Sequence, residues 1–182
     1  MSGRTPMRLR WMDAVDRVLV YGAVLLLLAM VLVTFVSTIG RTFFNHSLPD
    51  DILISEILMV AVVFLPLGHV QALGAHLEVT VLTDRMSPRS QERLYVAGLV
   101  FGLIFIGSMT YFTLRLAIES FLVGELAYGS LLNIPEWLAK AFIPVGLAWW
   151  WLRMAAQLLL PGMRPRPEGE IQRALEEGGA AG

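Results

Sequence analysis

Long apolar stretches alternate with short charged segments along this chain of 182 residues. Uncharged runs of 23, 21 and 21 residues lie between Arg17 and Arg41, between Glu56 and Glu78, and between Arg93 and Arg115. A helix rises about 1.5 Å per residue, so about 20 apolar residues cross the hydrocarbon core of a bilayer. With a further run near the C-terminal end, the pattern predicts an all-α membrane protein whose four transmembrane helices lie at approximately 18–40, 52–74, 94–115 and 138–160.

The last of these runs carries two basic residues. Lys140 and Arg153 lie near its ends, where long side chains are expected to extend toward the lipid headgroups. Tryptophan at positions 149–151 lies deeper in the same run and points in three directions around the helix. These rings are expected to pack against neighbouring helices and to bind no ligand.

Composition agrees with a lipid-facing surface and excludes several functions. The chain is 56% hydrophobic and only 16% charged, too little charge to cover a soluble domain of this size. It has no cysteine, which excludes disulfides, thiol nucleophiles and cysteine-ligated zinc. No basic face accompanies the apolar mass, so nucleic acid is not expected as a partner.

The distribution of basic residues predicts the orientation. Of the 14 Lys and Arg residues, 11 lie in the N-terminal segment, the second connection and the C-terminal end. The first and third connections hold only Arg41, Arg115 and Lys140. The positive-inside rule therefore predicts that both termini and the middle connection are cytoplasmic.

The segments that flank the spans differ in character. Residues 1–17 are amphipathic, with an i, i+4 pair of Asp13 and Arg17, and predict a short helix lying on the cytoplasmic surface. Residues 76–87 fit a strand period as well as a helical one, and their conformation stays open. The tail 161–182 is expected to be disordered because it combines helix breakers with small and charged residues.

Small residues recur where helices could approach closely. Gly98 and Gly102 form a GxxxG pattern in the third span, while Ala61, Gly68 and Ala72 share one face of the second. Glycine is common in membrane helices anyway, but we interpret these positions as packing faces. Proline at position 66 predicts a kink in the second span.

Three histidines raise the question of a metal or haem site. A b-type haem needs two imidazoles, generally from facing helices, but His46 is expected on the outer side, and His69 and His76 lie seven residues apart on one segment. A zinc site at His76 and Glu78 would need further ligands, which the sequence does not offer at a recognisable spacing. We therefore expect neither catalysis nor a metal or cofactor.

Glu56 is the charged residue that most needs an explanation. It lies about one turn inside the second span, where an unpaired carboxylate is unfavourable. It could extend outward to water or headgroups. We expect instead an ion pair with Arg41 across the first hairpin, with Lys140 as the competing partner.

The run Gly40 to Leu82 resembles the small membrane subunit of tripartite ATP-independent periplasmic (TRAP) transporters, the DctQ-like family. The resemblance rests on an Arg followed by aromatic residues and Asn, an acidic residue opening the second helix, a Gly in its middle, and a Gly-x-His-apolar-x-Val exit. These features correspond here to Arg41, Phe43, Phe44, Asn45, Glu56, Gly68, Gly74, His76, Leu77 and Val79. The later IPEWLAKAFIPVG, with Pro135 and Pro144, also looks like the family's entry to its fourth helix.

The start of the second helix departs from the family pattern. A Trp and two consecutive acidic residues are common there, whereas this chain has Ile54, Ser55 and Glu56, with Asp50 and Asp51 displaced upstream. Glu56 therefore carries the match alone. His76 is expected to mark where the second helix turns along the cytoplasmic interface. There Gly74 permits the bend, and a backbone group or a membrane phospholipid phosphate satisfies the imidazole.

The resemblance implies a scaffold in the bacterial inner membrane. In similar systems a large membrane subunit carries the substrate, usually a carboxylate, together with sodium ions, and a periplasmic substrate-binding protein delivers it. The small subunit braces the large one. Two other classes stay open: a self-contained small transporter or channel, which needs polar residues along a helix interior, and a membrane anchor for a redox complex, which needs haem or quinone ligands.

Overall fold

Residues 7–73 and 88–163 are described by the computed structural model, and all their regular elements are helices. These are α1 (Met7–Phe44), α2 (Asp51–Phe64), α3 (Leu67–Ala72), α5 (Pro88–Val123), α6 (Trp137–Leu159) and a short 3₁₀ helix η1 (Pro161–Met163). The all-α prediction is confirmed for this part of the chain. Gly74 and His76, the segment 76–87 and most of the predicted tail lie outside the described residues.

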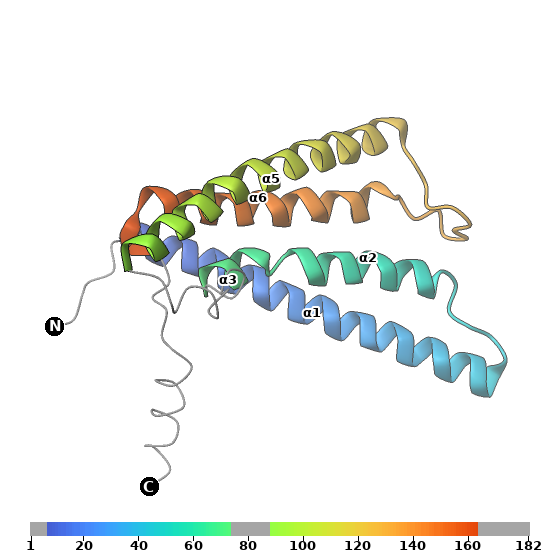
Figure 1. Ribbon diagram of the computed structural model, residues 1–182. Helices are drawn as coiled ribbons and strands as arrows, with labels where there is room; N and C mark the ends of the chain where they lie inside the picture. Colours follow the sequence, from blue (N-terminus) through green and yellow to red (C-terminus); the bar gives the residue numbers. More distant parts are fainter. Residues whose placement is uncertain (1–6, 74–87, 164–182) are drawn as a thin grey trace, which may run out of the picture.

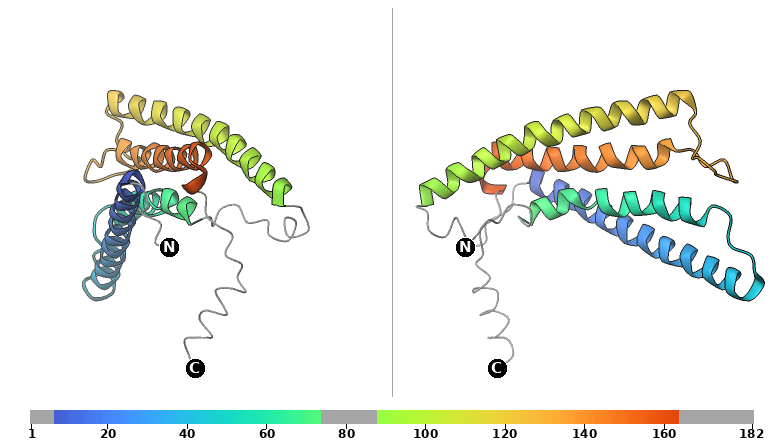
Figure 2. Two further views of the ribbon diagram at one scale, coloured as in Figure 1. Left: turned by 90° about the vertical axis from the view of Figure 1, so that its left-hand side faces the viewer. Right: turned by 45° about the vertical axis from the view of Figure 1, so that its right-hand side comes forward.

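The helices form two hairpins (Figure 1). In the first, α1 pairs with α2 and α3, and in the second α5 pairs with α6 along most of their length. The other side of α6 contacts α2 and α3, so this helix joins the two hairpins. The start of α1, the end of α3, the start of α5 and η1 lie at one end, called here the closed end, while the connections 45–50 and 124–136 lie at the other (Figure 2).

The predicted helix on the membrane surface before the first span does not exist as a separate element. One unbroken helix, α1, runs from Met7 to Phe44. No proline or glycine occurs between Met7 and Tyr21 to end a helix there. The predicted pair of Asp13 and Arg17 is also absent, because Asp13 bonds to Arg153 of α6 instead.

The predicted interruption at Pro66 is confirmed. Helix α2 ends at Phe64 and α3 begins at Leu67, so the second apolar run is two consecutive helices. Proline has no N–H to donate to the preceding turn, and its ring clashes with the carbonyl four residues before it. The break places α3, with His69 and Gln71, against the C-terminal half of α6.

Most of the apolar surface points outward. Within the described ranges, three helical segments are long and apolar enough to cross a membrane: Arg10–Phe44, Asp51–Ala72 and Ser90–Val123. The buried cores are small: one contains Leu99, Ile106, Leu147 and Met154 between α5 and α6, and another contains Ala23, Ala61 and Leu65 between α1 and α2. Such an outside is stable only in lipid or against other apolar surfaces.

Several glycines mark close helix contacts. A Cβ added at Gly68 would lie 2.2 Å from Trp149, and one at Gly102 would lie 2.3 Å from the end of the Met154 side chain. At Gly146 it would lie 2.2 Å from the main-chain oxygen of Phe64. Gly98, the other half of the GxxxG pattern, has no atom within 4 Å of such a Cβ among those described. Of the two glycines in the GxxxG pattern, Gly102 therefore packs closely against a neighbouring helix and Gly98 does not.

Candidate functional site

Three consecutive tryptophans connect α6 to three neighbouring helices. The indole N–H of Trp149 donates to Asp16 Oδ1 on α1 at 2.6 Å, and that of Trp150 donates to Gln71 Oε1 on α3 at 3.0 Å. Trp151 donates to the Leu103 carbonyl of α5 at 2.9 Å. Successive helical residues point about 100° apart, which is why one tripeptide reaches three directions. The rings pack as predicted, and their N–H groups add hydrogen bonds that hydropathy did not indicate.

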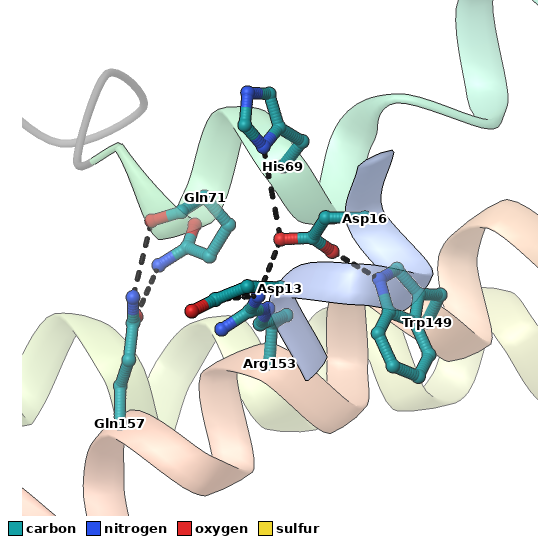
Figure 3. A network of polar contacts seen from close by, with 7 residues as sticks. All are labelled: Asp13, Asp16, His69, Gln71, Trp149, Arg153 and Gln157. Atoms are coloured by element: carbon teal, nitrogen blue, oxygen red, sulfur yellow. Dashed lines mark hydrogen bonds and ion pairs between the residues drawn. The ribbon is translucent and has the colours of Figure 1, made fainter. Parts of the chain in front are cut away.

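Around Trp149 lies a cluster of charged residues, called here the Asp–Arg cluster: Asp13, Asp16, His69, Trp149 and Arg153 (Figure 3). Arg153 Nη2 donates to Asp13 Oδ1 at 2.8 Å and to Asp16 Oδ2 at 2.5 Å. His69 Nδ1 lies 3.7 Å from the same Asp16 oxygen. The cluster therefore joins α1, α3 and α6 (Figure 3). Helix α3 lies toward the closed end of the bundle (Figure 1).

Burial differs sharply within the Asp–Arg cluster. The side chains of Asp16 and Arg153 are 2% and 4% exposed, whereas that of Asp13 is 55% exposed. A buried arginine is favourable only with a carboxylate partner, because removal from water is expensive for either charge alone. The expectation that Arg153 extends to the headgroups is therefore wrong. Arg153 lies seven residues before the end of the predicted span, and its guanidinium bonds to Asp13 and Asp16 of α1 instead.

One turn further along α6, a pair of buried amides continues the contact. Gln71 Nε2 donates to Gln157 Oε1 at 2.8 Å, and Gln157 Nε2 donates to the Gln71 carbonyl at 3.1 Å (Figure 3). The Tyr95 hydroxyl of α5 donates to the same Gln157 oxygen at 3.4 Å. Amides buried in an apolar setting are unfavourable unless bonded, and here each satisfies the other.

At the opposite end, Asp50 joins the two connections. Its carboxylate accepts hydrogen bonds from Ser130 Oγ at 2.8 Å and from the main-chain N–H groups of Leu131 and Leu132 at 3.0 and 2.7 Å. The backbone N–H of Leu131, then that of Leu132, holds the pKa of Asp50 below its ordinary value. Hydrogen bonds to the charged form favour it, so the contact is strongest when Asp50 is ionised.

We expect Asp50→Ala to release the connection 124–136 while the bundle stays folded. Amide hydrogen exchange at Leu131 and Leu132 should become roughly tenfold faster, since both N–H groups lose their acceptor. The wild-type protection should be complete above the ordinary pKa of Asp, should decline progressively as the pH falls below that value, and should be lost once the pH has dropped through the lowered pKa of Asp50. Mass spectrometry of peptides from 124–136 measures both effects.

The neighbouring Asp51 provides the control. Its carboxylate accepts from Ser37 of α1 and makes no contact with Leu131 or Leu132. Asp51→Ala should therefore leave exchange in 124–136 unchanged. Equal acceleration in the two variants would show that the protection has another source.

Lys140 is bound by two carboxylates near the same end. Its Nζ lies 2.5 Å from Glu125 Oε2 and 3.2 Å from Glu136 Oε1. The hydrogen bond from Lys140, with a second from Ser120, lowers the pKa of Glu125. Lys140 thus holds the third connection to the start of α6 and is not a partner of Glu56.

The predicted ion pair between Glu56 and Arg41 is also absent from the structure as described. Both side chains are exposed, and neither takes part in any ion pair of the described ranges. A side-chain hydrogen bond between α1 and α2 joins Ser37 and Asp51 instead. Glu56 follows Asp51 by five residues, a rotation of about 140° around the helix, so it points away from α1.

Asn45 has a local conformational role. It follows α1 with φ 52°, the left-handed conformation that commonly ends a helix and that Asn tolerates better than most residues. Some of the residues that the sequence analysis proposed as packing or ion-pair positions make close tertiary contacts. These are Gly68, Gly102 and Lys140.

Sequence reasoning missed the polar residues that hold the helices together. These are Asp16, Gln71, Gln157 and, as a buried group, Arg153. A signal was present: Trp149, Arg153 and Gln157 recur every four residues on α6 and so share one stripe. A stripe of hydrogen-bonding side chains inside an apolar helix indicates a helix–helix contact.

Comparison with known families assigns the chain. The model of the family described as tripartite ATP-independent periplasmic transporters, DctQ component, matches residues 30–161. The chain belongs to the DctQ family. No curated protein and no solved structure matches it.

The family match confirms the resemblance suggested by Arg41, Glu56 and Gly68, which all lie inside it. A DctQ chain is a transporter component and works as one part of a tripartite system, with a larger membrane subunit and a binding protein. The matched range contains His69, Gln71 and Arg153 but starts after Asp16. The α1 side of the Asp–Arg cluster is thus a feature of this chain outside the matched range.

Proposed function

We propose that this DctQ-family chain is the small scaffold subunit of a secondary-active, binding-protein-dependent transporter. It braces the large, substrate-translocating subunit in the bacterial inner membrane. The transported solutes are carboxylates and sodium is the coupling ion, as the resemblance to TRAP systems implies. The observation that carries the scaffold role is an exposed carboxylate on a helix face that is otherwise apolar.

That face is a stripe along α2, called here the α2 stripe: Ile52, Glu56, Met59 and Val63. Its hydrophobic members are 77%, 51% and 54% exposed, and Glu56 is exposed with them. A carboxylate facing hydrocarbon is unfavourable by several kcal/mol. A protein neighbour with a cation or hydrogen-bond donor removes that cost, so the α2 stripe suits contact with the large subunit better than contact with lipid.

A brace must also resist deformation, and the bonding around α6 supports this role. The buried Asp16, Arg153, Gln71 and Gln157 bond to one another across α1, α3 and α6. They hold the helices together near the closed end. In a self-contained transporter, polar side chains of these types would line a substrate pathway. Here they bond to one another instead.

We propose four spans, with both termini and the middle connection in the cytoplasm. Helix α6, flanked by α5 on one side and by α2 and α3 on the other, is the fourth span. In this orientation the closed end of the bundle faces the cytoplasm. The helix ends found there adjoin, along the chain, the segments that hold 11 of the 14 basic residues. Asp50, Glu125 and Lys140 lie on the periplasmic side.

Co-purification with the large subunit of the same transporter tests the proposal. Affinity-tagged small subunit is expected to recover the large subunit from detergent extracts, and Glu56→Ala should lower that recovery about tenfold or more. Reconstituted alone, the small subunit should move no solute. With the large subunit and the binding protein, carboxylate uptake should follow an imposed sodium gradient.

Glu119→Ala is the matched control, because Glu119 is an exposed carboxylate on α5, in the other hairpin. It should leave recovery of the large subunit unchanged. Saturable uptake by the small subunit alone would refute the scaffold role. Full recovery with Glu56→Ala would refute the α2 stripe as the contact while leaving that role standing.

A further inference from the structure

An open groove of about 790 Å³ lies between α5 and α6. Its wall consists mainly of apolar side chains, among them Leu103, Ile104, Phe112, Trp151 and Leu152. Three small residues, Gly107, Ser108 and Ala148, also line it. Ile104 and Phe112 are 66% and 68% exposed, so the groove opens on the outside of the bundle rather than into its core.

The groove has a built geometry. Trp151 donates its indole N–H to the Leu103 carbonyl, which lays the ring against α5 at Gly107. A Cβ at Gly107 would lie 2.9 Å from Trp151 Nε1, so only glycine admits the ring there. Along α5, Leu103 to Phe112 spans about 14 Å, close to the thickness of one leaflet of the hydrocarbon core.

A cation lies just beyond the end of the groove. Arg115 follows the groove residue Phe112 by three positions, and its guanidinium lies 6.0 Å from the ring centre of Tyr111, which also lines the groove. The side chain is exposed and joins no ion pair in the described ranges. About 33 Å of helix separates Arg93 from Arg115, so a spanning α5 places Arg115 at the level of lipid phosphates.

Glu119 lies one further turn outward on the same face of α5. Its side chain is exposed, and none of the described ion pairs includes it. A guanidinium binds phosphate with paired, charge-assisted hydrogen bonds. A carboxylate about 6 Å beyond it repels an anionic headgroup but attracts an ammonium.

We propose that the groove and Arg115 form a binding site for one phospholipid with an ethanolamine-type headgroup. One acyl chain lies along the groove from Phe112 toward Leu103 and Trp151, near the bilayer midplane. Arg115 holds the phosphate, and Glu119 contacts the ammonium. The match between groove length and leaflet thickness, together with the cation at the outer end of the groove, favours an acyl chain with its headgroup at Arg115.

Native mass spectrometry of the full chain in detergent tests this site, with dioleoyl phosphatidylethanolamine or phosphatidylglycerol added. The wild type should retain one phosphatidylethanolamine, more tightly than phosphatidylglycerol. Arg115→Gln should weaken retention roughly tenfold, the loss expected for one charged hydrogen bond. Glu119→Gln should remove the preference between the two lipids, and Ser108→Phe should prevent retention by filling the groove.

Two variants on α1 serve as matched controls. Arg41→Gln removes an exposed arginine that lies away from the groove. Thr34→Phe enlarges an exposed residue whose hydroxyl bonds to the carbonyl four residues before it, as that of Ser108 does. Both should retain the lipid like the wild type.

Equal losses for Arg115→Gln and Arg41→Gln would overturn the site. The site would also be overturned if the Ser108→Phe variant retained the lipid but no longer recovered the large subunit, because the groove would then be a contact with protein. Arg115→Gln alters no packed residue and decides the question even if Ser108→Phe folds poorly. The proposal does not depend on the scaffold role, so either can fail without the other.

Discussion

Asp16→Ala is expected to destabilise the helix bundle by about 3–5 kcal/mol, the range measured when one partner of a buried ion pair is removed. The variant leaves the buried Arg153 guanidinium without its buried carboxylate and deprives the Trp149 indole of its acceptor. Reversible unfolding in mixed micelles of increasing SDS content, followed by tryptophan fluorescence, measures the change.

Asp13→Ala is the matched control, because Asp13 bonds to the same arginine but is 55% exposed. Its loss should amount to less than about 1 kcal/mol, as for exposed ion pairs. The double variant Asp16→Ala with Arg153→Met should recover part of the loss from Asp16→Ala, since no unpaired charge then stays buried. Additive losses in the double variant would contradict the pairing on which the Asp–Arg cluster rests.

Gly146→Ala is expected to lower the stability by roughly 1–2 kcal/mol, although alanine is normally the better helix former. The new Cβ would lie 2.2 Å from the main-chain oxygen of Phe64, and backbone cannot move aside as a flexible side chain can. Overpacking of this kind costs about 1–3 kcal/mol, which exceeds the gain of about 0.5–1 kcal/mol from helix propensity. The same unfolding measurement applies.

Gly98→Ala is the control on α5. Nothing described lies within 4 Å of a Cβ at this position. The propensity gain should therefore appear unopposed, and the variant should match or slightly exceed the wild-type stability. A loss at Gly98 as large as that at Gly146 would show that helix approach does not explain the difference.

Much of the secondary structure follows from the sequence. Whether a segment is long and apolar enough to cross a bilayer depends only on neighbouring residues, so the runs after Arg17, Glu56 and Arg93 predict helices that the structure contains. The interruption at Pro66 follows in the same way, because a missing N–H is a property of that residue alone. The positions of the helix ends were not predicted, because α1 and α5 run beyond the apolar stretches at both ends.

The partners of the polar residues were decided by the tertiary structure. Arg153 lies 137 positions from Asp16 in the sequence. Its position near the end of an apolar run is equally compatible with a side chain that extends to the headgroups, so the sequence did not identify its partner. Glu56 and Arg41 are close in sequence, yet the Ser37–Asp51 contact sets a register that turns Glu56 away from α1. Side-chain pairing depends on the rotation of each helix against its neighbours. That rotation is set by contacts such as Gly68 with Trp149 and Gly146 with Phe64, which join elements far apart in the chain.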